Sequence, residues 1–305
     1  MFPVNGALRL PHLGVIRVEG PDAAAFLQGQ LSQDFLLLGP HEARLAAYCS
    51  AKGRMLASFI GFHYGLDCIL LVCSADLLPA TLKRLGMFVL RAKAKLSDAS
   101  ADFQLWGLAG NAIESIAGYA IPALVLADFS SVKVVGLHAA SGQQLALWLA
   151  PSAAAPPATP ALPAALWAWA EVCAGVATLS APLVEAFVPQ MLNYESVGGV
   201  SFKKGCYPGQ EVVARSQFRG TLKRRAYVVH AAGPLLPAQE IFHSADASQP
   251  CGSVVQAAVA PGGGYAAIVS MQTSAASAVV AGSLRTASGL ALTLQPLPYA
   301  LLADI

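Results

Sequence analysis

Two long stretches of the chain carry no charged side chain, and they set the first limit on its fold. They cover residues 134–170 and 247–284. About 20 continuous apolar residues would predict a transmembrane helix. Five prolines interrupt the first stretch, and two prolines and three consecutive glycines interrupt the second. We therefore expect packed cores and turns rather than membrane spans, although only 12% of the residues are charged against about a quarter in ordinary soluble chains.

The remaining bulk features point to a cytoplasmic protein of two or three packed subdomains. The 305 residues exceed the usual size of one domain. The N-terminal residues show neither a secretory signal nor an Arg-rich transit peptide. The six cysteines form no C-x-x-C pair, so we expect reduced thiols, and the six histidines show no metal-ligand spacing, so no metal site is predicted.

Residues 1–150 read as a mixture of helices and strands. A helix is expected after Asp22, with Phe26 and Leu27 on one face, and another after Ser74 or Asp76 as its N-cap. Short apolar or alternating segments predict strands at 13–18, 56–62, 69–73, 92–96, 103–108 and 145–149.

The second half begins with a linker and ends in short strands. Residues 151–163 are rich in proline and alanine and predict an exposed linker, and 166–176 predicts a helix that packs two tryptophans. Beyond it, β-rich segments separated by glycine and proline turns predict a small barrel. We expect an α+β fold divided at 1–150, 151–225 and 226–305, with the motif segment in the second part.

The most informative segment, residues 202–215, reads F-K-K-G-C-Y-P-G-Q-E-V-V-A-R. Tyr207-Pro208-Gly209 suits a type II turn, because proline fixes φ at the second position and glycine accepts a positive φ at the third. A helix should then begin at Gln210. Cys206 would lie just before it, beside two lysines, and both features favour a thiolate. From local features alone, a reactive thiol and a buried, inert cysteine remain equally open.

Positive charge is concentrated around this motif. Residues 203–225 hold seven basic side chains and one acidic one, a net charge of +6, which leaves −4 for the rest of a chain whose total is +2. The acid, Glu211, stands four residues before Arg215, where the two meet on one helical face. The cluster is either a solvated surface or an anion site. Few aromatic residues accompany it, so direct nucleic-acid binding is not expected.

The motif resembles the signature K-G-C-Y-x-G-Q-E of YgfZ-type folate-binding proteins in the glycine cleavage T-protein-like family. Its flanks are similar too, at 187–193 before the motif and at Arg219-Gly220 and Lys223-Arg224 after it, as are the blocks 18–31 and 51–56. The motif residues that carry the resemblance are Lys204, Gly205, Cys206, Tyr207, Gly209, Gln210 and Glu211.

This resemblance implies a fold and a cofactor. The family fold is a three-part cloverleaf around a central channel that can hold tetrahydrofolate or a derivative, with a C-terminal β-barrel. On this basis the candidate folate-binding residues are Gln190, Asn193, Arg215 and Arg224. Either arginine could grip a carboxylate of the glutamate tail of folate.

Two departures from the family pattern bear on activity. By this resemblance Ala57 stands where true T-proteins have their catalytic aspartate, and alanine cannot exchange a proton with a reacting amine. Cys173 likewise stands where T-proteins have the glutamate that anchors the pteridine ring. Ordinary aminomethyl transfer is therefore not expected.

The resemblance implies a non-catalytic tetrahydrofolate-binding factor that assembles or repairs iron–sulfur proteins, including tRNA-modifying iron–sulfur enzymes, with Cys206 as the reactive thiol. The expected partners are folate and iron–sulfur client proteins. Stable cluster ligation needs about four thiolates, so contact through one cysteine would be transient or shared. The alternative is a folate-dependent aminomethyl or other one-carbon transferase.

Overall fold

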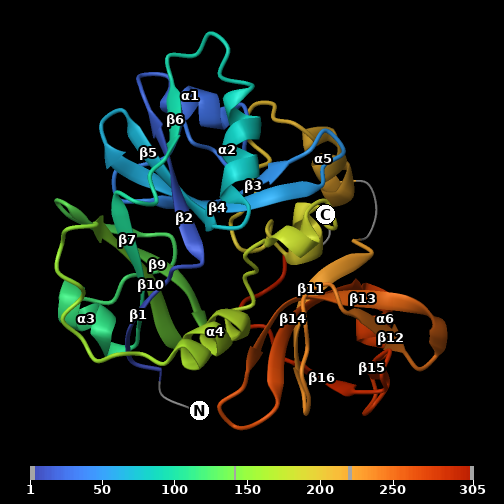
Figure 1. The fold of residues 1–305 in the computed structure, drawn as a ribbon. Coiled ribbons are helices and arrows are strands. Elements are labelled where there is room, and N and C mark those ends of the chain that lie inside the picture. Colours follow the sequence, from blue (N-terminus) through green and yellow to red (C-terminus); the bar gives the residue numbers. More distant parts are fainter. Residues whose placement is uncertain (1–3, 141, 219–221, 303–305) are drawn as a thin grey trace.

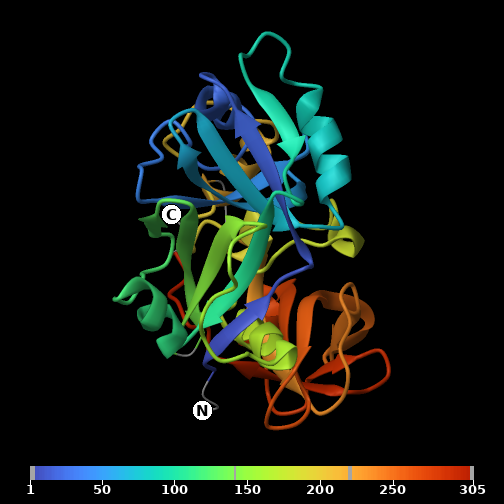
Figure 2. The same cartoon turned by 60° about the vertical axis from the view of Figure 1, so that its left-hand side comes forward.

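The computed structural model describes residues 4–140, 142–218 and 222–302, and it arranges them in three parts around a common centre (Figure 1). Two five-stranded antiparallel sheets form the N-terminal half, and a closed six-stranded barrel forms the C-terminal part. Helix α4 (Ala164–Cys173) lies between the second sheet and the barrel (Figure 2). The expected α+β fold with a terminal barrel is confirmed.

The first sheet has the strand order β3-β4-β5-β2-β6 and carries two short helices. Its strands are β2 (Leu13–Glu19), β3 (Ala43–Cys49), β4 (Met55–Gly65), β5 (Cys68–Ser74) and β6 (Lys95–Asp98). Its helices are α1 (Ala23–Gln28) and α2 (Leu78–Gly86). The strands predicted at 13–18, 56–62 and 69–73 are confirmed.

The strand predicted at 92–96 is displaced, because β6 begins only at Lys95. The preceding residues are held by the turn before α1. The Lys93 N–H donates to the Asp22 carboxylate at 2.7 Å, and the Asp22 N–H donates to the Lys93 carbonyl at 3.3 Å. These bonds to a neighbouring turn replace the strand pairing that the alternation predicts.

The predicted cap of α2 is wrong. The N-cap position is Leu77, and it makes no side-chain hydrogen bond to the helix. The Asp76 carboxylate instead accepts a hydrogen bond from the Ala181 N–H at 2.9 Å. It therefore fastens a distant segment to the start of the helix.

The second sheet has the strand order β1-β7-β10-β9-β8. Its elements are β1 (Gly6–Arg9), β7 (Phe103–Ala109), α3 (Asn111–Ala117), β8 (Leu126–Phe129), β9 (Val132–Ala140) and β10 (Gln143–Pro151). The strands predicted at 103–108 and 145–149 are confirmed. The other three strands were not predicted.

A central segment joins the sheets to the barrel. Residues 151–163 are mostly exposed, as expected, and lead into α4, whose Trp167 is buried over Gly107. A Cβ at Gly107 would lie 2.6 Å from the Trp167 ring, so the strand needs glycine there. The remaining elements of this segment are η1 (Ala181–Leu183), η2 (Pro189–Leu192) and α5 (Gln210–Phe218).

The barrel closes in the order β11-β14-β13-β12-β15-β16 around its own apolar core. Its elements are β11 (Arg224–Ala231), β12 (Glu240–His243), β13 (Asp246–Val259), β14 (Tyr265–Gln272), α6 (Thr273–Ser277), β15 (Leu284–Thr286) and β16 (Ala291–Gln295). Among the described residues, no helix is long and apolar enough to cross a membrane.

Candidate functional site

The motif turn has the predicted conformation. Gly209 has φ +80°, and the Gln210 N–H donates to the Tyr207 carbonyl at 3.1 Å, which closes a type II turn immediately before α5. Tyr207 is buried, whereas Cys206 is exposed at the surface. The buried position that the sequence left open for this thiol is therefore excluded.

Lys204 fastens the motif to the end of α1. Its buried ammonium group donates to the Leu31 carbonyl at 2.6 Å and to the Gln28 carbonyl, and it lies 4.7 Å from the centre of the Tyr207 ring. Burial lowers the pKa of Lys204 to about 8, while nearby Asp34 and Cys206 oppose this decrease. The ammonium group of Lys204, two residues before the thiol, therefore also holds the motif against the end of α1.

The motif also packs against the turn between β3 and β4. A Cβ on Gly209 would lie 2.4 Å from the Ser50 carbonyl oxygen and 2.6 Å from the Gly53 Cα, and a Cβ on Gly53 would lie 2.8 Å from the Val212 Cβ. Two backbones meet here without side chains between them. The blocks 18–31, 51–56 and 204–211, which are far apart in sequence, therefore converge at the motif that contains Cys206.

The exposed charges of the motif are arranged largely as their spacing predicts. Arg215 contacts Glu211 at 2.6 Å, and both side chains are exposed. Lys203 is exposed as well. Arg219 and Gly220, which extend the resemblance, lie outside the described residues.

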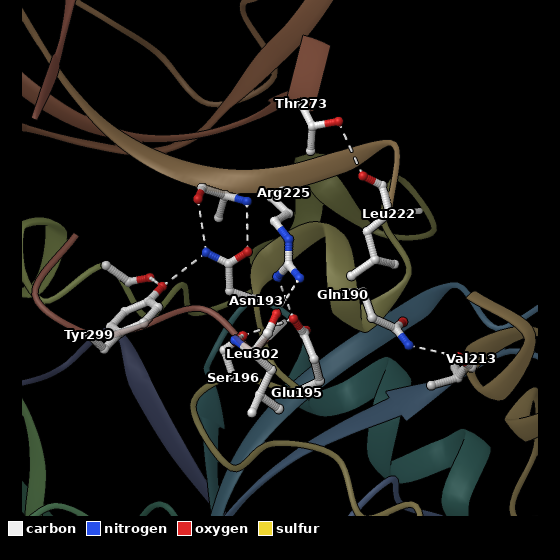
Figure 3. A network of polar contacts seen from close by, with 12 residues as sticks. Gln190, Asn193, Glu195, Ser196, Val213, Leu222, Arg225, Thr273, Tyr299 and Leu302 are labelled. Atoms are coloured by element: carbon white, nitrogen blue, oxygen red, sulfur yellow. Dashed lines mark hydrogen bonds and ion pairs between the residues drawn. The ribbon is translucent and has the colours of Figure 1, made fainter. Parts of the chain in front are cut away.

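Two of the candidate folate-binding residues are engaged within the protein (Figure 3). The Asn193 amide donates to the Ala226 carbonyl at 2.8 Å and to the Tyr299 hydroxyl at 3.2 Å, and it accepts from the Ala226 N–H at 3.1 Å. The Gln190 amide donates to the Val213 carbonyl at 2.7 Å, and its buried Oε1 has no partner among the described residues. These side chains join the central segment to β11 and α5.

The neighbouring arginines have different environments. Arg224 is half-buried at the start of β11. Arg225 is buried, and its guanidinium contacts the Glu195 carboxylate at 2.7 Å and donates to the Leu302 carbonyl at 2.8 Å (Figure 3). This pair, which sequence reasoning missed, links β11, the central segment and the C-terminal tail. Nothing in its local sequence pattern marks it.

A separate cavity lies between the two sheets and α4. Its volume is about 80 Å³, enough for several water molecules. Its wall is largely apolar, and its polar lining side chains are Ser58, His138, Glu171, Thr178 and Tyr194. None of the motif residues, nor any of the four candidate folate-binding residues, is among those that line it.

Glu171 supplies the carboxyl group of this cavity. Burial raises the pKa of Glu171 to about 7, and the neighbouring Trp167 indole opposes the rise in part. The buried Trp167 Nε1 makes no regular hydrogen bond within the described residues. Burial also lowers the pKa of His138, so a neutral imidazole faces the cavity. The signal for Glu171 was present in the sequence, because it is the first charge after the uncharged stretch 134–170.

The two departures from the family pattern occupy ordinary structural positions. Ala57 is fully buried in the core cluster under the first sheet. Cys173, at the end of α4, is half-buried, and burial raises the pKa of its thiol to about 11. Within residues 4–140, 142–218 and 222–302, no group of three or more His, Cys, Asp or Glu side chains is placed to hold a metal ion.

Comparison with known proteins finds relatives that match nearly the whole chain. No family model matches the chain. It is 30% identical to the tRNA-modifying protein YgfZ of Photorhabdus laumondii over 98% of this chain and 96% of that one. It is 31% identical to the protein of the same name from Edwardsiella ictaluri over 96% and 92%. Among solved structures, it resembles glycine cleavage system aminomethyltransferase T from Bartonella henselae, with a TM-score of 0.65 and 17% identity over 98% of this chain and 87% of that one. The likeness to the aminomethyltransferase structure concerns the fold alone.

Proposed function

Because this chain belongs to the YgfZ family of tRNA-modifying proteins, we propose that it is a non-catalytic, tetrahydrofolate-binding factor for the assembly or repair of iron–sulfur proteins. Its clients include iron–sulfur enzymes that modify tRNA, and Cys206 is its reactive thiol. The observation that carries this proposal is the convergence of three separate sequence blocks on the motif that holds one exposed cysteine. A buried lysine and two packed glycines hold that cysteine at the surface.

A single thiol restricts what the site can do with a cluster. Cys206 is exposed, whereas the other five cysteines are buried or half-buried. Stable iron–sulfur ligation takes about four thiolates. The cluster is therefore the client's cargo, and Cys206 contacts it, or the client protein, only transiently.

The cavity beside α4 suits the pterin ring of folate. The Glu171 carboxylate can accept hydrogen bonds from two adjacent ring N–H groups, and the neighbouring Trp167 Nε1 can donate to a ring acceptor. The apolar wall would cover the ring faces. Bound tetrahydrofolate would supply a reduced ring that can carry a one-carbon unit. Glu171, neutral below its pKa of about 7 and ionised above it, sets the charge presented to that ring.

The alternative, one-carbon transfer, requires a proton-exchanging group beside the reacting amine. Ala57 cannot supply one, and it is packed into the core. Glu171 is the acid among the described residues that line the cavity. Turnover of methylene-tetrahydrofolate with an aminomethyl donor would favour the transferase, and replacing Glu171 with Gln should then abolish it.

The thiol is tested by replacing Cys206 with Ser in cells that lack the native protein. We expect the variant to accumulate normally, because the side chain is exposed, yet to leave iron–sulfur enzymes inactive under oxidative stress and tRNA nucleosides under-modified. Cys68→Ala, at a half-buried cysteine of the first sheet, is the matched control and should restore both. Full rescue by Cys206→Ser would remove the thiol from the function.

Folate binding is tested separately by calorimetric titration of tetrahydrofolate. Glu171→Ala should weaken binding at least tenfold, because it removes the carboxylate from the cavity. Arg224→Ala tests whether the basic segment receives the glutamate tail. Equal affinity of that variant and the wild type would place the tail elsewhere.

A further inference from the structure

The helix α2 and the segment after it form a surface that no part of the described chain covers. A groove of about 300 Å³ runs between α2 and the segment near η1. Its apolar wall is formed by Leu56, Leu77, Met87 and Val184. Met87 is 58% exposed and Val184 40% exposed. Apolar side chains of this size normally pack against a partner when they line a concave surface.

Two basic side chains, Lys83 and Arg84, line this groove. Residues 77–97 contain five basic residues, between the flanking acids Asp76 and Asp98. The five are exposed, and no ion pair joins them to an acidic side chain within the described residues. Since the whole chain has a net charge of only +2, this surface is a local concentration of charge.

The loop after α2 adds a strained apolar residue. Leu90 is 86% exposed and has φ +43°, a conformation that bulky side chains rarely adopt. Phe88 beside it is 41% exposed. Because Met87 lines the groove, the loop 87–90 places further exposed apolar side chains next to it in the chain.

The groove lies on the same hairpin as the Cys206 site. Tyr48 and Leu56, which line it, belong to β3 and β4, and the turn between these strands packs against Gly209. In Figure 1, α2 and α5 belong to the same part of the molecule, with β3 and β4 beside them. A protein segment in the groove would therefore belong to a partner whose body can reach Cys206.

We propose that this groove, with its two basic side chains and the loop 87–90, is the docking site for an acidic, amphipathic segment of the client protein. The apolar face of the segment fills the groove, and its carboxylates meet Lys83 and Arg84, as in helix-in-groove recognition. The depth and apolar wall of the groove favour a peptide over RNA. Single-stranded RNA would stack its bases on several aromatic side chains, and Phe88 is the one exposed aromatic residue between 77 and 97. The concave shape favours a peptide over a flat lipid surface. The identity of the partner as a client rests on the proposed function, but the binding itself does not require Cys206.

The test uses a synthetic helical peptide with leucines on one face and glutamates on the other, and a second peptide with lysines in place of the glutamates. Binding to the full chain is measured by fluorescence anisotropy at low and high salt. We expect the acidic peptide to bind at least about tenfold more tightly than the basic one, and less tightly at high salt. Lys83→Glu with Arg84→Glu, and separately Met87→Glu, should each weaken it about tenfold or more.

A control with the same change in charge is Arg9→Glu with Arg285→Glu, two exposed arginines on other parts of the molecule. It should bind the acidic peptide as the wild type does. Cys206→Ser should also bind normally, which separates this proposal from failure of the thiol function. Equal binding of both peptides, no binding of the acidic one, or tighter Lys83- and Arg84-dependent binding of single-stranded RNA or phosphatidylglycerol vesicles would overturn the proposal.

Discussion

Replacement of Gly209 with alanine should disrupt the motif turn far more than replacement of Gly205, four residues earlier. At Gly209 the backbone has φ +80°, and the new methyl group would lie 2.4 Å from the Ser50 carbonyl oxygen. At Gly205 no heavy atom lies within 4 Å of the added Cβ, and φ is not positive. The two substitutions make the same chemical change in the same motif, so they form a matched pair.

The expected change in the free energy of unfolding follows from two destabilising effects and one stabilising effect. An L residue in the left-handed region costs about 1–2 kcal/mol, and forcing a methyl group into packed backbone costs about 1–3 kcal/mol. Loss of unfolded-chain entropy returns about 0.4–1 kcal/mol. We therefore expect Gly209→Ala to lower the free energy of unfolding by about 1–5 kcal/mol. Gly205→Ala should leave it unchanged or raise it by up to about 1 kcal/mol.

Urea and thermal unfolding followed by circular dichroism measure the difference. A second measurement, the rate at which a thiol reagent labels Cys206, reports on the turn itself, because the exposed thiol lies between the two glycines. Labelling should change in Gly209→Ala and stay constant in Gly205→Ala. If both variants unfold within about 0.5 kcal/mol of each other, the two turns do not meet backbone to backbone, and the convergence of the three blocks at the motif is refuted.

Three further substitutions test the buried charges. Burial raises the pKa of Glu171 to about 7 in the folded protein, so the stability of the wild type should fall as pH rises from about 4.5 to 7. In urea unfolding, Glu171→Gln should match the wild-type stability at pH 4.5 and exceed it by about 3 kcal/mol at pH 8. Arg225→Met leaves the fully buried Glu195 carboxylate without its ionic partner, with only the hydrogen bond from Ser196 remaining among the described residues. It should cost about 3–5 kcal/mol, with partial recovery when Glu195→Gln is added in a double-mutant cycle. Lys204→Met removes the donor to the Leu31 carbonyl and should cost about 1.5–3 kcal/mol, with faster amide exchange across the motif.

Features set by neighbouring residues could be predicted from the sequence. The motif turn is one, because Pro208 and Gly209 restrict the backbone angles that define it. The contact of Glu211 with Arg215 is another, because the spacing along α5 determines it. Three strands of the first sheet, at 13–18, 56–62 and 69–73, follow in the same way from short apolar runs.

Features set by distant partners could not be predicted in this way. The carbonyl that Lys204 binds at Leu31 lies 173 residues away in the chain. The partner of Arg225, Glu195, is 30 residues away on another element. The displaced start of β6 has the same origin, because the turn around Asp22 competes for its backbone bonds. Local pattern carries no information about which segments will pack together.

The cavity and the motif that contains Cys206 contact the same hairpin. Ser58, Phe59 and Ile60 of β4 line the cavity, and the turn between β3 and β4 holds Gly209. That turn is fixed by its own bonds, since the Ser50 N–H donates to the Arg54 carbonyl at 2.8 Å and the Gly53 N–H donates to the Ser50 carbonyl at 2.8 Å. Coupling between sites requires an element with two alternative arrangements. A hairpin bonded in this way has a single arrangement. It therefore holds Cys206 at a constant position relative to the cavity and does not switch between two positions.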